Sequence, residues 1–420
     1  MQSNRVIVVG GGAAGCMAAG TAAENCAEVL LLEKNEKLCR KVMITGKGRC
    51  NVTNAVEDVQ TLISHVPGNG RFLYSAFSAF LPQDAMDFFT DYGVPLKVER
   101  GNRVFPQSDR AADIADALVR FLDDTGVHRA HERVTEVLIK DGRAVGVKTA
   151  SGKTLKADCI IVTTGGLSYP QTGSTGDGYA FAKAAGHTVT PLRPSLSALC
   201  CREGFCSDCA GLSLRNVAIH VKDTKTKKEI YHDFGEMLFT HFGVSGPMIL
   251  SASAHMRQME PARYTITIDL KPALSAEQLD ARILRDFNEN HNKAISNTLP
   301  LLLPHALIPV VLRLSGIKPS EKVNQITREM RTRLLETVKG LPLTVLDFYD
   351  IRQAIVTAGG VSTKEVNPKT MESKLVKGLY FAGEVLDVDA YTGGFNLQIA
   401  FATGRLAGLS AATETIESEP

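Results

Sequence analysis

The first chemically informative feature of the sequence is a glycine turn near the N-terminus. Gly10, Gly12 and Gly15 directly follow an apolar, β-branched run at residues 5–9, as in the strand-to-helix turn of dinucleotide-binding proteins. In such a turn the first glycine allows the bend, the second lets the backbone approach a pyrophosphate, and the third lets helix and strand pack closely. The helix that follows would direct its N–H groups and the positive end of its dipole at the phosphates.

Residues beside this turn narrow the choice of cofactor. Ala13 and Ala14 belong to the same turn, and Glu33 ends a second apolar run at residues 29–32. A carboxylate at that place can accept both hydroxyls of an adenosine ribose and repels a 2′-phosphate. The turn is therefore predicted to hold FAD or NAD rather than NADP. A glycine-rich turn of another α/β fold is the alternative, but the glycines, the strands and the acid agree with one another.

A basic segment favours FAD over NAD. Residues 34–51 are rich in Arg, Lys and Asn and are broken by glycines, unlike a Rossmann helix. We expect a loop that runs along an extended polar cofactor, and a solvated basic face is the alternative. The cofactor-binding candidates in this segment are Arg40, Lys41, Gly48, Arg49, Cys50 and Asn51.

Two motifs near the C-terminus point to the flavin itself. Gly383 and Glu384 follow an apolar run, and this carboxylate can contact a ribityl chain; an ordinary strand-end turn is the alternative. Gly394, Asn396 and Leu397 begin a final helix. The N-terminus of that helix can face a flavin pyrimidine ring and stabilise the negative charge that develops at N1 and O2 on reduction.

The overall composition limits the class of protein. The chain has 420 residues, 44% hydrophobic and 22% charged, which is typical of a globular protein and excludes wholesale disorder. Its net charge of +2 gives no electrostatic argument for nucleic acid or an anionic membrane as partner. Nine cysteines, an odd number, do not fit a secreted disulfide framework and indicate reduced thiols in a cytoplasmic protein.

Two apolar stretches could be mistaken for targeting or membrane segments. Residues 6–23 carry no charge, but they are too rich in glycine for a good spanning helix. Residues 299–312 are interrupted by three prolines and are too short to cross a bilayer. We expect neither a membrane segment nor an export signal.

The elements that must position these residues form an α/β pattern with an interruption. Residues 134–164 predict a β-meander, with a hairpin turn at Asp141 and Gly142, followed by a buried strand. A glycine-rich loop at 173–178 is expected to open a helix with Asp177 as its cap. Beyond residue 190 the expected elements are strands at 212–221 and 263–270 and helices at 275–290 and 320–339.

The Rossmann-like pattern returns near residue 351, so the predicted fold class is α/β, with one nucleotide-binding domain built from both chain ends. An inserted domain separates its two parts. The expected boundaries are 1–190 and 351–413 for the nucleotide-binding domain, 191–350 for the insert and 414–420 for a flexible polar tail.

The motifs together resemble a family of FAD flavoproteins that includes bile-acid-type enone reductases and aminoacetone oxidase-like enzymes. The resemblance implies a nucleotide domain of the glutathione reductase type and an insert that combines a β-barrel-like part with helices. It also implies that the backbone of Val134 contacts adenine and that Asn396 and Leu397 lie at the flavin end. It extends from residue 4 to about 411, and the matching segments are 10–15, Glu33, 40–41, 45–54, 69–73, 103–106, 173–178, 238–247, 359–361 and 378–396.

The reaction is less defined than the cofactor. No second strand, glycine turn, helix and acid unit occurs, so we expect NAD(P)H to visit the flavin only transiently. The preferred prediction is NAD(P)H-dependent reduction of an activated C=C bond, in an enone of steroid or bile-acid type, by hydride transfer through flavin N5. One alternative is an amine oxidase of aminoacetone type that uses O₂. Others are a flavoprotein acting on tRNA, against which the near-neutral charge counts, and a flavin-binding protein with a structural or regulatory role.

The partner expected for the preferred reaction is a small organic substrate, with no nucleic acid or membrane. The catalytic residues stay undefined. His241 could act as an acid, although we expect a hydrogen-bonded core histidine. Tyr391 could protonate an enolate or merely pack against the ring, and for Cys50 a structural role is favoured because it lacks a resolving partner at the usual spacing.

A cysteine cluster in the insert is the least explained feature. Four thiols within ten residues could bind Zn²⁺ or an iron–sulfur cluster. Adjacent cysteines are poor chelators of one ion, however, and no second CxxC pair follows. We therefore predict no metal site and a loop with free or occasionally oxidised thiols at Cys200, Cys201, Cys206 and Cys209.

Overall fold

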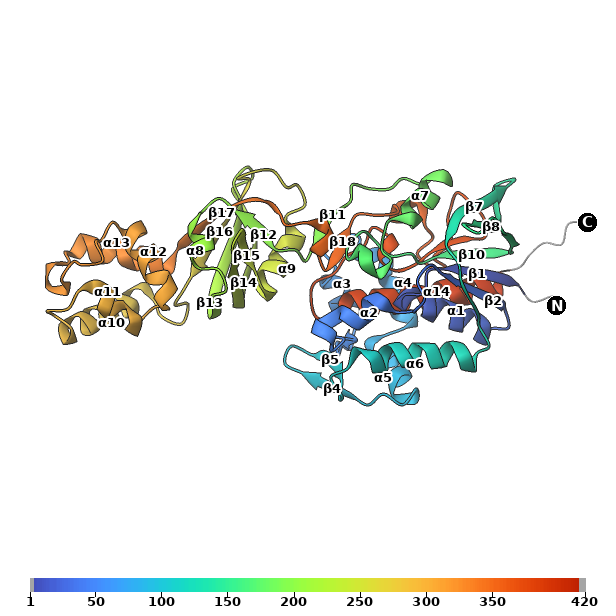
Figure 1. Ribbon diagram of the computed structural model, residues 1–420, viewed down its shortest axis with the longest axis horizontal. Helices are drawn as coiled ribbons and strands as arrows, with labels where there is room; N and C mark the ends of the chain where they lie inside the picture. The colour runs from blue at the N-terminus through green and yellow to red at the C-terminus, as the bar shows by residue number, and fades with distance from the viewer. Residues whose placement is uncertain (1–3, 415–420) are drawn as a thin grey trace, which may run out of the picture. The chain divides into compact units, whose positions relative to one another are not determined.

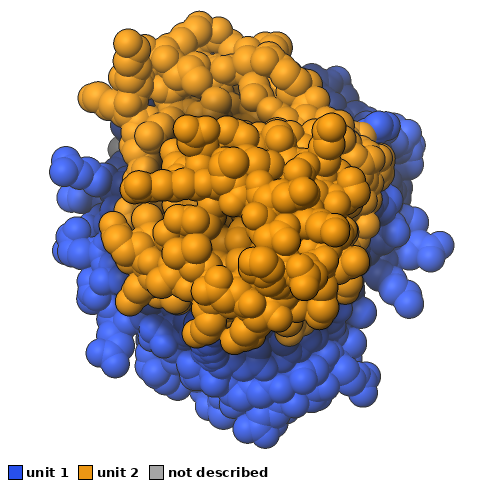
Figure 2. Space-filling model, turned by 90° about the vertical axis from the view of Figure 1, so that its left-hand side faces the viewer, with its two compact units in different colours: residues 1–195, 351–420 blue, residues 196–350 orange. Residues whose placement is uncertain are grey.

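The computed structural model describes residues 4–414, and the chain divides into two compact units. Unit 1 comprises the residues up to Ser195 and those from Ile351 onward, and unit 2 comprises Leu196–Asp350 (Figure 2). These divisions lie beside the expected boundaries, five residues later than expected on the N-terminal side. Unit 1 is thus assembled from both ends of the chain.

The centre of unit 1 is a parallel sheet of five strands in the order β19-β10-β1-β2-β6. Figure 1 labels β10, β1 and β2 of this sheet. Its three inner strands are buried along most of their length because β-branched and leucine side chains cover both faces. The strands are β1 (Arg5–Val9), β2 (Glu28–Glu33), β6 (His128–His131), β10 (Cys159–Val162) and β19 (Leu379–Phe381).

Two helices from opposite ends of the chain, α1 (Ala13–Glu24) and α14 (Phe395–Thr413), lie side by side against this sheet (Figure 1). Glycines in α14 allow their close approach. A Cβ atom at Gly404 would lie 2.4 Å from the carbonyl oxygen of Ala14, and one at Gly408 would lie 2.3 Å from that of Ala18. Backbone packs on backbone along this interface.

Smaller elements complete unit 1. Residues 40–48, where a loop was expected, instead form the short helix α2 (Arg40–Ile44) and a 3₁₀ turn at Thr45–Gly48, kinked where Gly46 and Lys47 have positive φ. The expected hairpin is present in the sheet β7-β8-β9. The remaining elements are β3 (Thr53–Asn54), α3 (Val59–Ser64), α4 (Tyr74–Ala79), α5 (Pro82–Asp91), β4 (Leu96–Glu99), β5 (Arg103–Pro106), α6 (Ala111–Asp124), β7 (Val134–Lys140), β8 (Arg143–Thr149), β9 (Thr154–Lys156), α7 (Asp177–Ala184), β11 (Arg193–Ser195) and β18 (Val356–Ala358).

Two details of unit 1 differ from the prediction. Asp177 is the first residue of α7 rather than its cap; the cap position belongs to Gly176, which has positive φ. The predicted flexible tail begins too early at 414. Glu414 accepts hydrogen bonds from the Tyr380 hydroxyl at 2.8 Å and from Arg143 at 3.0 Å, and residues 415–420 lie outside the described part of the chain.

Unit 2 is a closed β-barrel with helices, as the predicted insert requires. The expected strands at 212–221 and 263–270 are β13 and β16. The expected helix at 320–339 begins only at Arg328, because the Thr327 side chain accepts from the Met330 N–H and caps the helix there. The elements are β12 (Leu199–Cys201), α8 (Phe205–Asp208), β13 (Ser213–Asp223), β14 (Glu229–Thr240), β15 (Gly243–Ser245), α9 (Pro247–His255), β16 (Tyr264–Asp269), α10 (Ala276–Glu289), α11 (Ile295–Thr298), α12 (Ile308–Ser315), α13 (Arg328–Lys339) and β17 (Leu341–Phe348).

The predicted fold class, a Rossmann-like α/β domain from both chain ends with a mixed barrel and helical insert, is confirmed. Within residues 4–414, no helix is both long enough and apolar enough to cross a membrane.

We predict that Gly404→Ala destabilises unit 1 by about 1–3 kcal/mol, because the new methyl group would force α14 away from the Ala14 carbonyl. Urea unfolding measures the loss. Gly204→Ala is the matched control, since nothing lies within 4 Å of its Cβ position and its φ of −59° suits alanine. Equal stability of the two variants would contradict the role of this interface.

Candidate cofactor site

A cavity in unit 1 opens at the carboxyl ends of β1, β2 and β10, where parallel sheets of this kind bind ligands. Its walls come from both parts of the chain, because β1 and α1 belong to the N-terminal part and α14 to the C-terminal part. The predicted site residues that line it are Gly10, Gly12, Ala13, Ala14, Glu33, Arg40, Lys41, Val134, Glu384, Asn396 and Leu397.

The N-terminus of α1 leaves free space where a phosphate would bind. Gly12 is the N-cap residue, no side chain caps the helix, and its first turn holds no acidic residue. A Cβ atom at Gly12 would meet nothing within 4 Å, whereas one at Gly15 would lie 1.8 Å from the Gly10 carbonyl oxygen. Gly12 therefore keeps the approach to the helix dipole open, and Gly15, which does not line the cavity, permits the tight packing behind it.

Glu33 points from the end of β2 toward the glycine turn. Its Oε2 accepts a hydrogen bond from the Gly11 N–H at 2.6 Å, and its Oε1 accepts from the backbone and side-chain N–H groups of Asn35 at 2.8 and 2.6 Å. The carboxylate is therefore fixed at the cavity wall, where it can receive ribose hydroxyls.

Three further charged residues line the same end of the cavity and were not among the predicted binding residues. Asp177 forms ion pairs with Lys34 at 2.8 Å and Arg133 at 3.1 Å. Burial opposes ionisation of Asp177, but the hydrogen bonds and charges of Lys34 and Arg133 outweigh it, so the pKa of this carboxyl lies below its usual value. One indication in the sequence that this group could lie at the site is that Lys34 directly follows Glu33.

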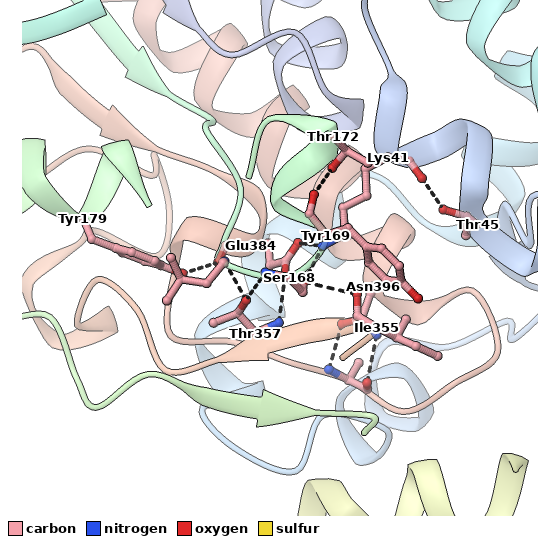
Figure 3. A network of polar contacts seen from close by, with 12 residues as sticks. Lys41, Thr45, Ser168, Tyr169, Thr172, Tyr179, Ile355, Thr357, Glu384 and Asn396 are labelled. Atoms are coloured by element: carbon pink, nitrogen blue, oxygen red, sulfur yellow. Dashed lines mark hydrogen bonds and ion pairs between the residues drawn. The ribbon is translucent and has the colours of Figure 1, made fainter. Parts of the chain in front are cut away.

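Glu384 anchors a polar network at the other end of the cavity (Figure 3). Its Oε2 lies 2.7 Å from Lys41 Nζ, and its Oε1 accepts from the Thr357 N–H at 2.8 Å and the Ser168 hydroxyl at 3.0 Å. Lys41 Nζ also donates to the Ser168 hydroxyl at 2.7 Å. Lys41 and Glu384, both predicted as binding residues, are thus brought together. Ser168 and Thr357 complete the network. In sequence, Ser168 follows the glycine pair at 165–166, and Thr357 precedes the pair at 359–360.

The start of α14 is shaped by close backbone contacts. Gly394, its N-cap, has a φ of 99°, and a Cβ there would lie 2.3 Å from the Thr53 carbonyl oxygen. Asn51, with its amide oriented by its partners, accepts from the Gly394 N–H at 3.1 Å and donates to the Thr53 carbonyl at 3.0 Å. Asn51 therefore lies behind the turn and holds it, while Asn396 and Leu397 line the cavity.

Other predicted cofactor residues do not line the cavity. Arg49 pairs with Glu99 at 2.5 Å and with Asp109 at 2.6 Å, and its guanidinium lies 4.2 Å from the centre of the Phe105 ring. Gly48 is in the kinked turn before it. Gly383 packs against α1, where a Cβ atom would lie 2.8 Å from the Cβ of Ala14.

Among the thiol candidates, Cys50, Cys206 and Cys209 are buried and Cys200 and Cys201 are partly buried. Burial, together with the nearby Cys39, raises the pKa of the Cys50 thiol, which makes it a poor nucleophile. In the insert, a hydrogen bond with Cys206 and burial raise the pKa of the Cys201 thiol. No group of three or more His, Cys, Asp or Glu side chains placed to hold a metal is found among residues 4–414.

The two other catalytic candidates lie in different units. His241 is exposed in unit 2, so the expectation of a core histidine is wrong; its ring meets only the edge of Phe242 among the ring contacts described. Tyr391, in unit 1, precedes α14, and its N–H donates to the His65 carbonyl at 3.0 Å. His65 was not among the predicted catalytic candidates, because no motif surrounds it in the sequence.

The sheet order, the open glycine turn and the acid at the end of β2 define a dinucleotide-binding domain of Rossmann type. The chain belongs to the family described as HI0933-like protein Rossmann domain, which it matches over residues 4–410. This confirms the FAD oxidoreductase resemblance, and the residues present fit FAD: Gly12 leaves the phosphate position free, and Glu33 and Glu384 line the two ends of one cavity.

Two relatives are similar along nearly their full length. The 3-dehydro-bile acid delta(4,6)-reductase of Clostridium scindens is 33% identical, over 97% of this chain and 99% of the relative. The ribosomal RNA dihydrouridine synthase of Escherichia coli is 30% identical, over 96% of each. The solved structure of 3-ketosteroid delta1-dehydrogenase from Sterolibacterium denitrificans shares the fold, with a TM-score of 0.53 at 13% identity, over 98% of this chain and 100% of the other.

We predict that Gly12→Val leaves the apoprotein as stable as the wild type but weakens FAD binding more than about tenfold, or ~1.4 kcal/mol, because the side chain occupies the phosphate position. Fluorescence titration of apoprotein with FAD measures the affinity, and thermal unfolding measures the stability. Gly15→Val is the contrasting variant, expected to impair folding itself. Unchanged FAD affinity in Gly12→Val would contradict the placement of the pyrophosphate.

Glu33→Arg is expected to abolish FAD retention during purification, because it removes the ribose acceptor and places a cation against the Gly11 N–H. The ratio of FAD to protein absorbance after gel filtration provides the measurement. Glu36→Arg, an exposed neighbour, makes the same change in charge and should retain FAD. Full retention by Glu33→Arg would mean that the ribose lies elsewhere.

Proposed function

We propose that this FAD-dependent oxidoreductase uses NAD(P)H to reduce a carbon–carbon double bond conjugated with a carbonyl group. One observation carries the proposal: the names of both full-length relatives describe the saturation of such a bond. A Δ4 double bond in a 3-dehydro steroid is conjugated with the 3-oxo group. Dihydrouridine is uridine whose C5–C6 bond, conjugated with the C4 carbonyl, has been saturated.

Bound FAD supplies hydride transfer through its N5 atom. The chain contributes binding and electrostatics: the open start of α1 for the pyrophosphate, Glu33 for the ribose, and Lys41 with Glu384 for the polar chain that leads to the flavin. The N-terminus of α14, begun by Gly394, offers partial positive charge for the end of the flavin where charge develops.

The hydrogen bonds of Glu384 and Lys41 support the binding role given to these two residues. Because the Glu384 carboxylate already receives hydrogen bonds from Thr357 and Ser168, its orientation is set before a cofactor binds. Lys41 then adds a cation that is held by both Glu384 and Ser168. Such preorganised groups need no rearrangement during the reaction. The sequence contains no second glycine turn of this type that could hold NAD(P)H, which supports transient binding of NAD(P)H at the flavin.

The substrate we favour is a small enone with a steroid-like skeleton. A uracil base in RNA is the second candidate, and the similarity to the ribosomal RNA dihydrouridine synthase favours it. The near-neutral charge of the chain gives less support to an RNA partner. The amine oxidase alternative shares the cofactor site but requires a different donor and O₂ as acceptor.

Anaerobic reduction of the yellow holoenzyme distinguishes these functions. NADH or NADPH should bleach the flavin absorbance, and a 3-oxo-Δ4 steroid should then restore it. Restoration by uridine-containing ribosomal RNA but not by the steroid would favour the second candidate. Failure of both nicotinamides, with bleaching by small amines such as aminoacetone, would contradict the reductase and support the oxidase.

A further inference from the structure

His65, the residue that follows α3, is part of an aromatic cluster at the start of α14. Its ring stacks on Phe395, with centroids 4.2 Å apart and planes at 16°, and meets the edge of Tyr391 at 6.1 Å. Its carbonyl oxygen accepts the Tyr391 N–H at 3.0 Å. Backbone and ring together therefore attach His65 to the turn between Tyr391 and Phe395.

The hydrogen bonds of the ring define which nitrogen can titrate. Nδ1 lies 2.8 Å from the Thr61 carbonyl oxygen, and a carbonyl can only accept, so Nδ1 carries the proton in the neutral ring. Nε2 then holds the free lone pair. Nε2 is therefore the ring nitrogen at which a second proton can be accepted.

The cluster adjoins the part of the cavity assigned to the flavin. Phe395 is the first residue of α14, and the next two residues, Asn396 and Leu397, line the cavity. Reduction of a flavin there adds negative charge at the helix N-terminus. His65 does not line the cavity itself, but its ring stacks on Phe395, which directly precedes Asn396 in the chain. A positive charge on the His65 ring would be favoured by negative charge at this helix start, and the linkage is reciprocal.

We propose that His65 is a redox-linked proton site, which takes up a proton from solvent when the bound flavin is reduced and releases it on reoxidation. Reduction by NAD(P)H transfers one hydride, that is, two electrons and one proton. Together with the proton on His65, the reduced protein then holds the two electrons and two protons that saturate one C=C bond. Only this last use of the proton rests on the proposed function.

Other titratable or charged groups surround the cluster and must be separated from His65. Apart from His65, the groups on α3, on the segments that follow it and on the loop before α14 are the N-cap Asp58, Arg71, Tyr74, Asp387, Asp389 and Tyr391. Of these, Asp389 accepts from the Ser195 hydroxyl at 2.6 Å and Asp387 accepts from the Asn69 side chain. Histidine alone among these residue types ordinarily titrates between pH 5 and 8.

The pH dependence of the flavin midpoint potential tests the proposal in the holoenzyme without any substrate. One proton per two electrons gives a slope of about 30 mV per pH unit, and two protons give about 59 mV. We expect the steeper slope over part of the range from pH 5.5 to 8.5. A slope of about 30 mV throughout that range in the wild type would overturn the proposal before any variant is made.

Variants assign the second proton. His65→Gln should reduce the slope to about 30 mV per pH unit. His128→Gln should keep the steeper slope, because His128 opens β6 at the end of the sheet opposite the cavity. Tyr391→Phe should also keep it, since the phenol is not the proton site. A steep slope that persists in His65→Gln would overturn the proposal, whether the proton belongs to Tyr391 or to flavin N1, and the absorbance spectrum of the reduced form would identify protonation of N1.

These outcomes are independent of the substrate. If enones fail to reoxidise the flavin but the potential shows the His65-dependent slope, the proposed function fails and the proton site stands. If enones are reduced and the slope is shallow, the reverse holds.

Discussion

The contact between α1 and α14 is the constraint on which the rest of unit 1 depends. One helix follows the first strand and the other ends the described chain, and they touch backbone to backbone at Gly404 and Gly408. This contact sets the N-terminus of α1 and the N-terminus of α14 on one cavity. Two partial positive charges therefore face one cavity, which suits the proposed placement of the phosphates at the start of α1 and of the flavin at the start of α14. Side chains larger than glycine at these two positions would separate the helices and with them the two ends of the site.

The cavity balances its charges locally. Lys34 and Arg133 are paired with Asp177, and Lys41 is paired with Glu384. Basic residues that appear in the sequence as one run are thus divided among separate partners in space. Because Lys34, Arg133 and Lys41 are each held by a carboxylate, these parts of the wall present fixed hydrogen-bonding groups rather than one strong positive field; Arg40, which also lines the cavity, donates to the Asn35 side chain at 3.0 Å. Such a surface suits a long cofactor whose charge is concentrated at the pyrophosphate.

Local patterns in the sequence predicted the fold and the arrangement of the glycine turn beside Glu33, because the turn, its strand and its acid are determined by neighbours along the chain. Long-range partners could not be predicted in this way. Arg49 was expected at the cofactor, but its carboxylate partners Glu99 and Asp109 lie 50 and 60 residues further along. His65 gave no local signal, because its significance comes from Phe395 and Tyr391, which only the folded chain brings to it. Periodicity also placed the start of α13 too early, where a single side-chain cap at Thr327 decides the boundary.

The pairing of β11 with β18 explains how unit 2 can be inserted into the sequence of unit 1. Arg193 lies opposite Ala358 and Ser195 opposite Val356, so the chain leaves unit 1 and returns to it through two hydrogen-bonded antiparallel strands. Seen from unit 1, the whole of Leu196–Asp350 is the loop of a hairpin. The entropy cost of closing a flexible loop rises only by about 0.6 kcal/mol for each doubling of its length. A folded insert whose own ends already lie together reduces even that cost, so unit 1 can accommodate a domain of very different size at this point without loss of its cofactor site.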